Sequence, residues 1–334
     1  MSKLLVLSGR EVHALLGYRE CAGAMREALI ALQAGRAQMP LRTVIRPEGA
    51  PGLVALMPSY RQGAGADGAT AAYGLKAICI TPANPAAGLD THQGVVLVSD
   101  GTTGEPLALM NASALTEIRT AAVSVVATEL LARPEADVLA VIGTGVQARS
   151  HVLALQEARD LREIRLAGRT QERARQLAAS LAGEVSAPVI ASGSAQDAVA
   201  GAGIVVTATS SAEPVLRAGW LAPGTHINAV GACLPTDREL DTATMASGVL
   251  FADRRDSLLN ESGDYVLAAA EGAVGPEQVR AELGQILTGE APGRQAAGEL
   301  TIFESLGLAI EDLAAAGCAY DLAAASGGGT WVEF

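Results

Sequence analysis

The sequence predicts an α/β protein, in which a doubly wound parallel sheet is joined to a second unit of the α+β class. Three observations lead to this prediction. From Val138 onward, short and wholly apolar segments alternate with helical segments, as in a parallel sheet covered on both faces. The apolar run Val138–Ile142 leads directly into the spacing G-x-G-x-x-A, from Gly143 to Ala148. The N-terminal third instead shows short strand-like segments separated by turn residues, which is typical of an antiparallel or mixed sheet.

The N-terminal third is expected to begin with helices and to continue with strands. Residues 9–37 have the pattern of a helical hairpin, which Ser8 can cap at its start and Gly35 ends. The strand-like segments that follow are Arg42–Arg46, Gly52–Met57, Tyr73–Ile80, Val95–Asp100 and Pro106–Met110. The last two flank a Gly-Thr-Thr-Gly sequence and are predicted to form a β-hairpin. The Gly- and Ala-rich stretch 62–72 is predicted to be an exposed loop.

A long helix is predicted from Asn111 to Leu130, ending before Pro134. The buried strands expected after it are Val138–Ile142, Ile164–Ala167, Pro188–Ala191, Ile204–Ala208, His226–Val230 and Val249–Ala252. Six strands of this kind make up a Rossmann-type dinucleotide-binding sheet, which binds its ligand at the carboxyl ends of the strands.

The pattern also predicts two domains. Residues 120–304 are expected to form the Rossmann-type, NAD(P)-binding domain. Residues 1–119 are expected to join residues 305–334 in the second domain, because the last helix is expected to return to the N-terminal part. Two helices are predicted near the end of the chain, over 275–289 and 299–316, followed by a loose tail at residues 327–330.

Composition excludes several classes of function. The 334 residues carry a formal net charge of −12 and no basic cluster, which argues against nucleic acid and anionic membranes as partners. No apolar run reaches the ~18 residues of a membrane span, and the N-terminus lacks an Ala-x-Ala-type cleavage site. Cys21, Cys79, Cys233 and Cys318 are scattered, so we expect reduced thiols in a cytoplasmic protein and no metal site.

The stretch from Gly143 to Ala148 has the spacing that a dinucleotide needs at a strand–turn–helix junction. Gly143 permits the tight turn, Gly145 lets the backbone approach a pyrophosphate, and Ala148 lets the helix lie close to the strand. The helix N-terminus offers unpaired N–H groups to the phosphates. The alternative is a turn that binds nothing, since Gly and Ala are abundant in this chain. A second strand, Glu163–Ala167, follows at the spacing expected of a βαβ unit, which favours the interpretation as a dinucleotide-binding site.

The tip of that second strand indicates which cofactor is preferred. A free ribose 2′-hydroxyl is usually bound there by Asp or Glu, but the sequence reads Gly168-Arg169-Thr170. Arg169 and Thr170 offer a cation and a hydroxyl to a 2′-phosphate, so the prediction is NADP(H), with NAD(H) as second choice. Alternatively, Arg169 is a solvated residue at the start of the next helix. The predicted cofactor site comprises Gly143, Thr144, Gly145, Val146, Gln147, Ala148, Arg169, Thr170, Thr207, Ala208, Thr209, Val230 and Gly231.

The scarcity of lysine singles out one position. Of the 24 basic residues, only Lys3 and Lys76 are lysines. Lys76 lies inside the apolar run Tyr73–Ile80, where burial would lower its pKa and let it give or take a proton as arginine cannot. The alternative is a strand-edge lysine that extends to water.

Several motifs of the chain are similar to those of one family. They are Pro40–Thr43, Gly74–Lys76, Thr91–Gly94, Ala114–Ala122, Gly143–Ala148 and His226–Gly231, the last followed by Pro235 and Arg238–Asp241. On these motifs the chain resembles the ornithine cyclodeaminase and mu-crystallin family over nearly its full length. The resemblance implies a homodimer, in which the mixed first domain forms the subunit interface and carries the substrate pocket. It also implies a bound nicotinamide cofactor and a small imino or amino acid substrate.

The resemblance assigns roles to particular residues of the first domain. By motif, Arg42, Lys76 and Arg119 match the catalytic residues that hold the substrate carboxylate beside the nicotinamide, and Thr91 matches a substrate-binding residue. Two guanidinium groups can bind a carboxylate, and a lysine can supply a proton to the reacting nitrogen. His92 is either an acid/base group or, more simply, a structural histidine.

One substrate-binding position departs from the family pattern. Ornithine cyclodeaminases carry an Asp two residues after a Val-Gly pair, whereas this chain has Cys233 after Val230-Gly231. A neutral thiol cannot pair with a substrate ammonium as a carboxylate does. The function implied is therefore an NADP(H)-dependent cyclic ketimine reductase, as in the mu-crystallins, or an amino-acid dehydrogenase. Ornithine cyclodeaminase is the alternative within the family, and a non-catalytic NADP(H)- or ligand-binding protein is the alternative from another class.

Overall fold

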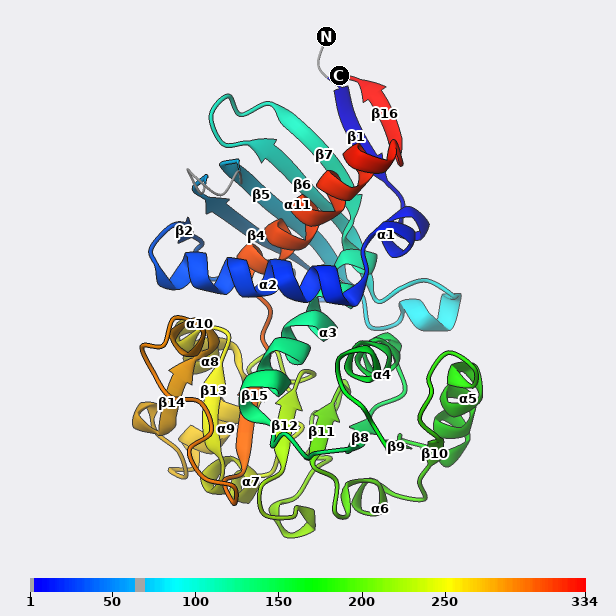
Figure 1. Ribbon diagram of the computed structural model, residues 1–334, viewed down its shortest axis with the longest axis vertical. Coiled ribbons are helices and arrows are strands. Elements are labelled where there is room, and N and C mark those ends of the chain that lie inside the picture. Colours follow the sequence, from blue (N-terminus) through cyan, green and yellow to red (C-terminus); the bar gives the residue numbers. More distant parts are fainter. Residues whose placement is uncertain (1–2, 64–69) are drawn as a thin grey trace. The chain divides into compact units, whose positions relative to one another are not determined.

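The structure, a computed structural model, describes residues 3–63 and 70–334 (Figure 1). Its internal contacts divide the chain into two compact units. The first consists of Met1–Arg119 and Leu308–Phe334, and the second of Thr120–Gly307. The first unit therefore contains both ends of the chain. The boundary near residue 119 falls within one long helix, α3 (Ala112–Leu131).

The first unit is built on a mixed sheet. Its strands are β1 (Lys3–Leu7), β2 (Ala37–Gln38), β3 (Thr43–Ile45), β4 (Leu53–Arg61), β5 (Ala72–Ile80), β6 (His92–Asp100), β7 (Pro106–Asn111) and β16 (Thr330–Glu333). The order is β16-β1-β7-β6-β5-β4-β2, with β3 paired to β4, and β1–β7 is the parallel pair. The β6–β7 hairpin agrees with the prediction. Of the predicted loop 62–72, residues 64–69 lie outside the described residues, and Ala72 begins β5.

Helices cover one face of this sheet. The helical elements of the first unit are α1 (Gly9–Leu15), α2 (Tyr18–Gln33), a short 3-10 turn η2 (Asn84–Ala87) and α11 (Ala309–Ser326). Figure 1 shows α2 and α11 on the same face of the sheet, and α11 packs against α2, β4, β5 and β6. On β5, Gly74 and Lys76 point toward the helices, whereas Tyr73 on the opposite face is half exposed. Gly74 is required because a Cβ there would lie 2.9 Å from the Cβ of Leu313 on α11.

The second unit is built on a parallel sheet. Its strands are β8 (Val138–Ile142), β9 (Glu163–Ala167), β10 (Val189–Ala191), β11 (Ile204–Thr207), β12 (His226–Ala229), β13 (Val249–Ala252), β14 (Val279–Glu282) and β15 (Thr301–Glu304). The order is β10-β9-β8-β11-β12-β15-β13-β14, and every pair is parallel. The chain leaves β8 in one direction for β9 and β10 and later returns to its other side with β11. This reversal between β8 and β11 marks the place where such sheets bind ligands.

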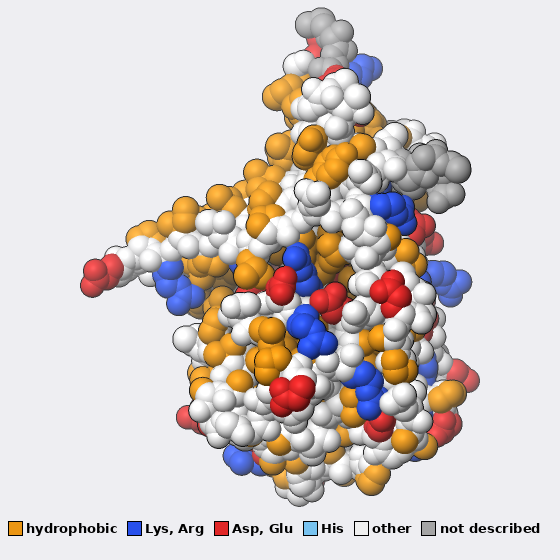
Figure 2. All heavy atoms as spheres, turned by 90° about the vertical axis from the view of Figure 1, so that its left-hand side faces the viewer, with side chains coloured by type: hydrophobic (Ala, Val, Ile, Leu, Met, Phe, Trp, Pro, Cys, Tyr) orange, Lys and Arg blue, Asp and Glu red, His pale blue; other side chains and the backbone are white. Residues whose placement is uncertain are grey.

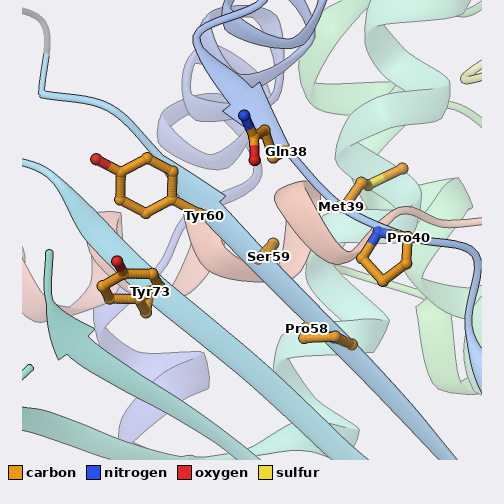
Figure 3. A pocket seen from close by; sticks show the side chains of 7 residues that line it. All are labelled: Gln38, Met39, Pro40, Pro58, Ser59, Tyr60 and Tyr73. Atoms are coloured by element: carbon orange, nitrogen blue, oxygen red, sulfur yellow. The ribbon is translucent and has the colours of Figure 1, made fainter.

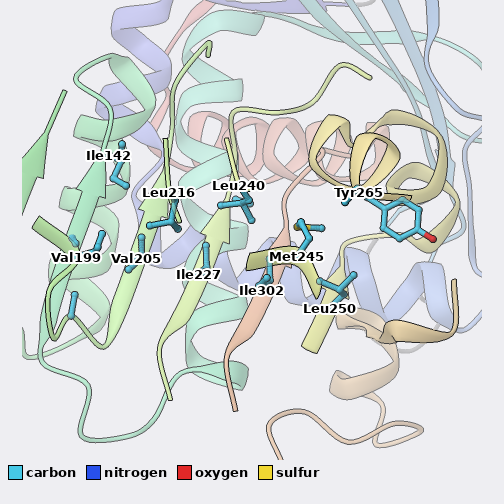
Figure 4. Packing of buried hydrophobic residues seen from close by; sticks show 14 of the residues in the cluster. Ile142, Val199, Val205, Leu216, Ile227, Leu240, Met245, Leu250, Tyr265 and Ile302 are labelled. Carbon is cyan, nitrogen blue, oxygen red and sulfur yellow. The ribbon is translucent and has the colours of Figure 1, made fainter. Parts of the chain in front are cut away.

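The core of the second unit lies between the sheet and its helices. The helical elements are α4 (Val146–Ala158), α5 (Gln171–Leu181), α6 (Ala195–Val199), η3 (Ala218–Trp220), α7 (Thr242–Ser247), α8 (Arg255–Glu261), α9 (Gly263–Ala270), η4 (Pro276–Gln278) and α10 (Leu283–Leu287). Figure 4 shows Val205, Ile227 and Ile302 of neighbouring strands packed with Leu216 and Leu240 from the connections. All five side chains are fully buried. This continuous apolar layer fixes the carboxyl ends of the strands, where the cofactor residues were predicted.

Two strands replace predicted helices near the end of the chain. The predicted helix 275–289 is wrong, because the segment holds the 3-10 turn η4, the edge strand β14 and the short helix α10. The predicted helix 299–316 is wrong in its first half, where β15 inserts between β12 and β13. Gly307, with φ of 78°, separates β15 from α11. The sheet therefore has eight strands in place of the six predicted.

The C-terminal end of the chain is more ordered than predicted. Residues 327–330 were expected to be a loose tail, but Thr330 begins β16, which pairs with the N-terminal strand β1. Trp331 anchors this strand, because its ring packs edge-on against Tyr320 and its Nε1 donates to the carbonyl of Gly328 at 3.1 Å.

No helix of the described residues is long and apolar enough to cross a bilayer.

Candidate active site

The loop after β8 turns tightly at Gly143 and leaves open space at the start of α4. Gly143 has φ of 137°, and a Cβ there would lie 2.4 Å from the carbonyl oxygen of Ala208, so no other residue fits without strain. Gly145 precedes α4 in an extended conformation, and no side chain caps the helix. A Cβ on Gly145 would meet nothing within 4 Å. The N–H groups that begin α4 thus border open space, which fits a phosphate group.

The tip of β9 lacks an acid for a structural reason. A Cβ at Gly168 would lie 2.5 Å from Cγ2 of Thr144, so the methyl group of the glycine-rich loop occupies the space of a side chain. Arg169 and Thr170 are exposed, and the Thr170 hydroxyl caps α5 by accepting from the amide of Arg173 at 3.4 Å. Ala148 is fully buried, as close helix–strand packing requires, whereas Val146 is half exposed.

A buried carboxylate joins the ends of β11 and β12. Glu239 accepts the amide of Thr209 at 2.6 Å with one oxygen and the amide of Gly231 at 2.7 Å with the other. A Cβ on Gly231 would lie 2.6 Å from the Glu239 carboxyl carbon, so this glycine is needed for the close approach. Sequence reasoning missed Glu239, although it stands in the motif Arg238–Asp241. No signal in the sequence separates Glu239 from its acidic neighbours Asp237 and Asp241 in the same loop.

Further carboxyl groups lie behind Glu239. Asp264 accepts the amides of Glu239 and Leu240 at 2.7 and 2.8 Å, and Glu304 accepts the hydroxyl of Ser262 at 2.9 Å. Burial, and then the neighbouring Glu239, raise the pKa of Asp264 to about 8. Burial, and then Asp264, raise the pKa of Glu304 well above its usual range. Across residues 3–63 and 70–334, no His, Cys, Asp or Glu cluster has the arrangement of a metal site.

These raised pKa values predict a loss of stability at mildly basic pH. The folded protein retains protons on Asp264 and Glu304 that the unfolded chain has already released, so its free energy of unfolding should fall as the pH rises toward 8. His92, His151 and His226 have lowered pKa values and act in the opposite direction, but only below about pH 6.5. Urea unfolding at pH 6.5 and pH 8 measures the difference. Asp264→Asn should reduce this difference in stability between pH 6.5 and pH 8. A urea midpoint that rises toward pH 8 would contradict the raised pKa values of Asp264 and Glu304.

The first unit contains a buried cluster of opposite charges. Nζ of Lys76 lies 2.7 Å from Oδ2 of Asp312, and Nε of Arg119 lies 3.1 Å from Oδ1 of the same carboxylate. Nη1 of Arg119 also pairs with Oε2 of Glu311 at 3.1 Å. All four side chains are at most 6 % exposed. β5 supplies the lysine, α3 the arginine and α11 both acids, so two of the three predicted cations are brought together by carboxylates that sequence reasoning missed. The third, Arg42, is half-buried in the loop between β2 and β3.

The charges of this cluster perturb one another. Burial, together with the nearby charges of Arg119 and Arg42, lowers the pKa of Lys76 to about 8, although Asp312 opposes this shift. Burial, and then the positive charges of Lys76 and Arg119, lower the pKa of His92 to about 4. His92 is therefore neutral at physiological pH. A lysine with a pKa near 8 can donate a proton close to neutrality, which is what a general acid needs.

The remaining predicted substrate residues lie in different places. Thr91 is half-buried, and its carbonyl accepts the amide of Thr81 at 2.9 Å next to β6. Cys233 belongs to the second unit and is half-buried in the loop after β12. A pocket of about 420 Å³ in the first unit is lined by Gln38, Met39, Pro40, Pro58, Ser59, Tyr60 and Tyr73. Figure 3 shows the two tyrosine rings side by side, and none of the predicted site residues lines this pocket.

Comparison with known proteins gives the family. Residues 2–327 match the ornithine cyclodeaminase/mu-crystallin family. The chain belongs to this family. The mouse (Mus musculus) member described as ketimine reductase mu-crystallin is 39 % identical over 287 residues, which cover 86 % of each chain.

Solved structures of the family are similar over the whole chain. The Δ1-pyrroline-2-carboxylate reductase of Thermococcus litoralis, in complex with NADH and L-proline, has a TM-score of 0.93 and 35 % identity, covering 98 % of this chain and 100 % of that one. An archaeal alanine dehydrogenase dimer with bound NAD has a TM-score of 0.91 and 32 % identity, covering 100 % of both chains. The predicted fold class and family are thereby confirmed.

Proposed function

We propose that this protein reduces a small cyclic imino acid, a pyrroline- or piperideine-2-carboxylate, with NADPH. It is an oxidoreductase that acts on the carbon–nitrogen bond of small imino or amino acids, like the relatives it matches over most or all of its length. The observation that carries the choice of reduction is the buried, proton-bearing Lys76 beside Arg119. Cys233, in place of an acid, argues against a diamino acid substrate.

The chain's own residues supply binding and the proton. The nicotinamide, when bound, supplies a hydride to the imine carbon. Arg119 and Arg42 hold the substrate carboxylate and so orient the ring, as bidentate guanidinium groups do. Lys76 donates a proton from Nζ to the imine nitrogen, so that the C=N bond becomes CH–NH and the lysine is left neutral. The amides at the start of α4 and the space at Gly145 would hold the pyrophosphate.

The absorbance of NADPH, followed with each of the two cyclic imino acids, tests this function directly. Substrate-dependent oxidation of NADPH supports the proposal. Ammonia release from ornithine without added cofactor would identify a cyclodeaminase instead. Tight NADPH binding without turnover on either imino acid would identify a ligand-binding protein.

The choice of NADPH over NADH rests on Arg169 and Thr170 at the tip of β9. Arg169→Ala is expected to raise KM for NADPH roughly 10- to 100-fold, which corresponds to the loss of one charge-assisted hydrogen bond. KM for NADH should stay unchanged. Arg175→Ala is the matched control, because this arginine is exposed like Arg169 but lies on α5, where it donates to Gln171 at 2.9 Å. An equal loss for both cofactors in Arg169→Ala would contradict the preference.

We also propose a homodimer in the reducing cytoplasm, in which the first unit forms the interface. The face of its sheet opposite α2 and α11 exposes apolar side chains, among them Ile45, Tyr73 and Val95, each 39–51 % exposed. Figure 2 shows such hydrophobic side chains gathered along one flank of the molecule. An apolar surface of this kind usually marks an interaction site. Sedimentation equilibrium measures the mass, and Val95→Arg should yield monomers if this face is the interface.

A further inference from the structure

Asp312 occupies a central position in the buried cluster of the first unit. It lies in the first turns of α11 and is 1 % exposed. Its two carboxylate oxygens engage two different cations, Lys76 at 2.7 Å and Arg119 at 3.1 Å. An aspartate that binds both proposed substrate residues determines where each of their charged ends points.

The surroundings of Lys76 explain why such a partner is needed. An isolated ammonium group buried among apolar residues would lose its proton at neutral pH. The charged and titratable groups in and around this cluster include Arg42, His92, Arg119, Glu311 and Asp312. Cys21 on α2 also faces the cluster, and its thiol stays neutral because burial raises its pKa. His92 is neutral and the two arginines repel the ammonium, so negative charge must balance them. Asp312 is the acid in direct contact with Nζ.

We propose that Asp312 is a positioning residue, which keeps Lys76 protonated and oriented until the proton passes to the substrate nitrogen. This inference rests on the proposed function for the fate of the proton, but the effect of Asp312 on Lys76 is independent of it. The proton balance is complete: Nζ–H breaks, N–H of the product forms, and the neutral lysine regains a proton from water. Asp312 neither gives nor takes a proton in this step and stays paired with Arg119.

Glu311 provides a matched comparison on the same helix turn. It also binds Arg119 and is fully buried, but its pair is with Nη1 of the arginine and not with Lys76. Its carboxylate accepts the amide of Leu308 at 3.2 Å, which caps α11. Removal of the Glu311 charge therefore perturbs the cluster and the helix without touching the ammonium directly.

The two-lysine composition permits a direct measurement. Protein labelled with ¹³C at lysine Cε should give two side-chain resonances, one from Lys3 and one from Lys76. Titration of the wild type should show one resonance changing at the ordinary lysine pKa and one near pH 8. In Asp312→Asn the second midpoint should move down by one pH unit or more, whereas in Glu311→Gln it should move less than half as far. Asp312→Glu, which restores the charge, should bring it back toward the wild-type value.

The outcomes that would overturn the inference are equally plain. If both lysines of the wild type titrate at the ordinary lysine pKa, the inference is overturned. This measurement uses the wild type alone, so it does not depend on whether a variant folds. An unchanged or raised titration midpoint of Lys76 in folded Asp312→Asn would also overturn the inference.

Measurements of catalytic activity provide a second test, which distinguishes a failure of this inference from a failure of the proposed function. If the wild type reduces cyclic imino acids, the basic limb of its kcat profile should move to lower pH in Asp312→Asn. At high pH the rate should then fall about tenfold for each pH unit by which the limb moves. A rate that falls equally at every pH would indicate a merely structural role for Asp312. If the wild type reduces none of them, the proposed function fails, and the lysine titration still decides whether Asp312 controls Lys76.

Discussion

Replacement of Lys76 by methionine is expected to lower kcat/KM for imine reduction by about 10²- to 10⁴-fold, the usual contribution of a positioned general acid. Methionine is unbranched and of similar length, so it can fill the same buried volume between β5 and α11. It cannot donate a proton or balance Asp312, which is left with Arg119 as its ion-pair partner. Steady-state kinetics with pyrroline-2-carboxylate measure the loss.

The other lysine of the chain is the matched control. Lys3→Met removes the same charge at the exposed start of β1, and the rate should remain that of the wild type. Affinity for NADPH, measured from the fluorescence of the bound cofactor, should be unchanged in Lys76→Met because the glycine-rich loop belongs to the other unit. A Lys76→Met protein with near-normal turnover would show that the proton comes from elsewhere.

The two glycines of the loop after β8 should respond differently to the same substitution. Gly145→Ala is expected to weaken NADPH binding roughly 10- to 100-fold, because its methyl group enters space that the pyrophosphate would use. The free energy of unfolding without cofactor should change by less than about 1 kcal/mol, since nothing lies within 4 Å of the added carbon. Fluorescence titration and thermal unfolding measure the two quantities.

Gly143→Ala provides the contrast to Gly145→Ala. Its φ of 137° and the contact of 2.4 Å with Ala208 should destabilise the protein even without cofactor, by about 1–3 kcal/mol. Equal unfolding temperatures for the two variants would mean that the loop does not have the conformation described. Unaltered NADPH affinity in Gly145→Ala would mean that the cofactor binds elsewhere.

The parallel sheet was predictable where strands are buried on both faces. β8, β11 and β13 consist of continuous apolar or nearly apolar residues next to glycine or helix signals, and the structure places these strands where they were expected. β14 and β15 escaped prediction because each lies inside a segment whose pattern predicts a helix, 275–289 for β14 and 299–316 for β15. Their strand conformation comes from pairing with β13 and β12, which no local pattern reveals.

The sequence predicted the basic residues of the candidate site but not the acidic residues that pair with them. Lys76 was conspicuous because lysine is rare and its neighbours are apolar. Glu311 and Asp312 resemble solvated charges at the start of a helix, and more than 190 residues separate them from Arg119. One signal was present in the sequence, since these two acids are followed by a run of alanines in a helix that is otherwise largely apolar. The roles assigned to Arg42, Thr91 and Cys233 remain predictions.

The order in which the ribosome makes this protein has a consequence for how it folds. Residues 120–307 are contiguous, so every strand of the second sheet is available while translation continues. The N-terminal 119 residues must wait for α11 and β16, which come last, before their sheet gains its covering helix and its edge strand. Until then Lys76 is without its acidic partner and the apolar side of β4, β5 and β6 is bare. Limited proteolysis of stalled nascent chains should therefore cut the N-terminal segment long before it cuts the finished nucleotide-binding sheet.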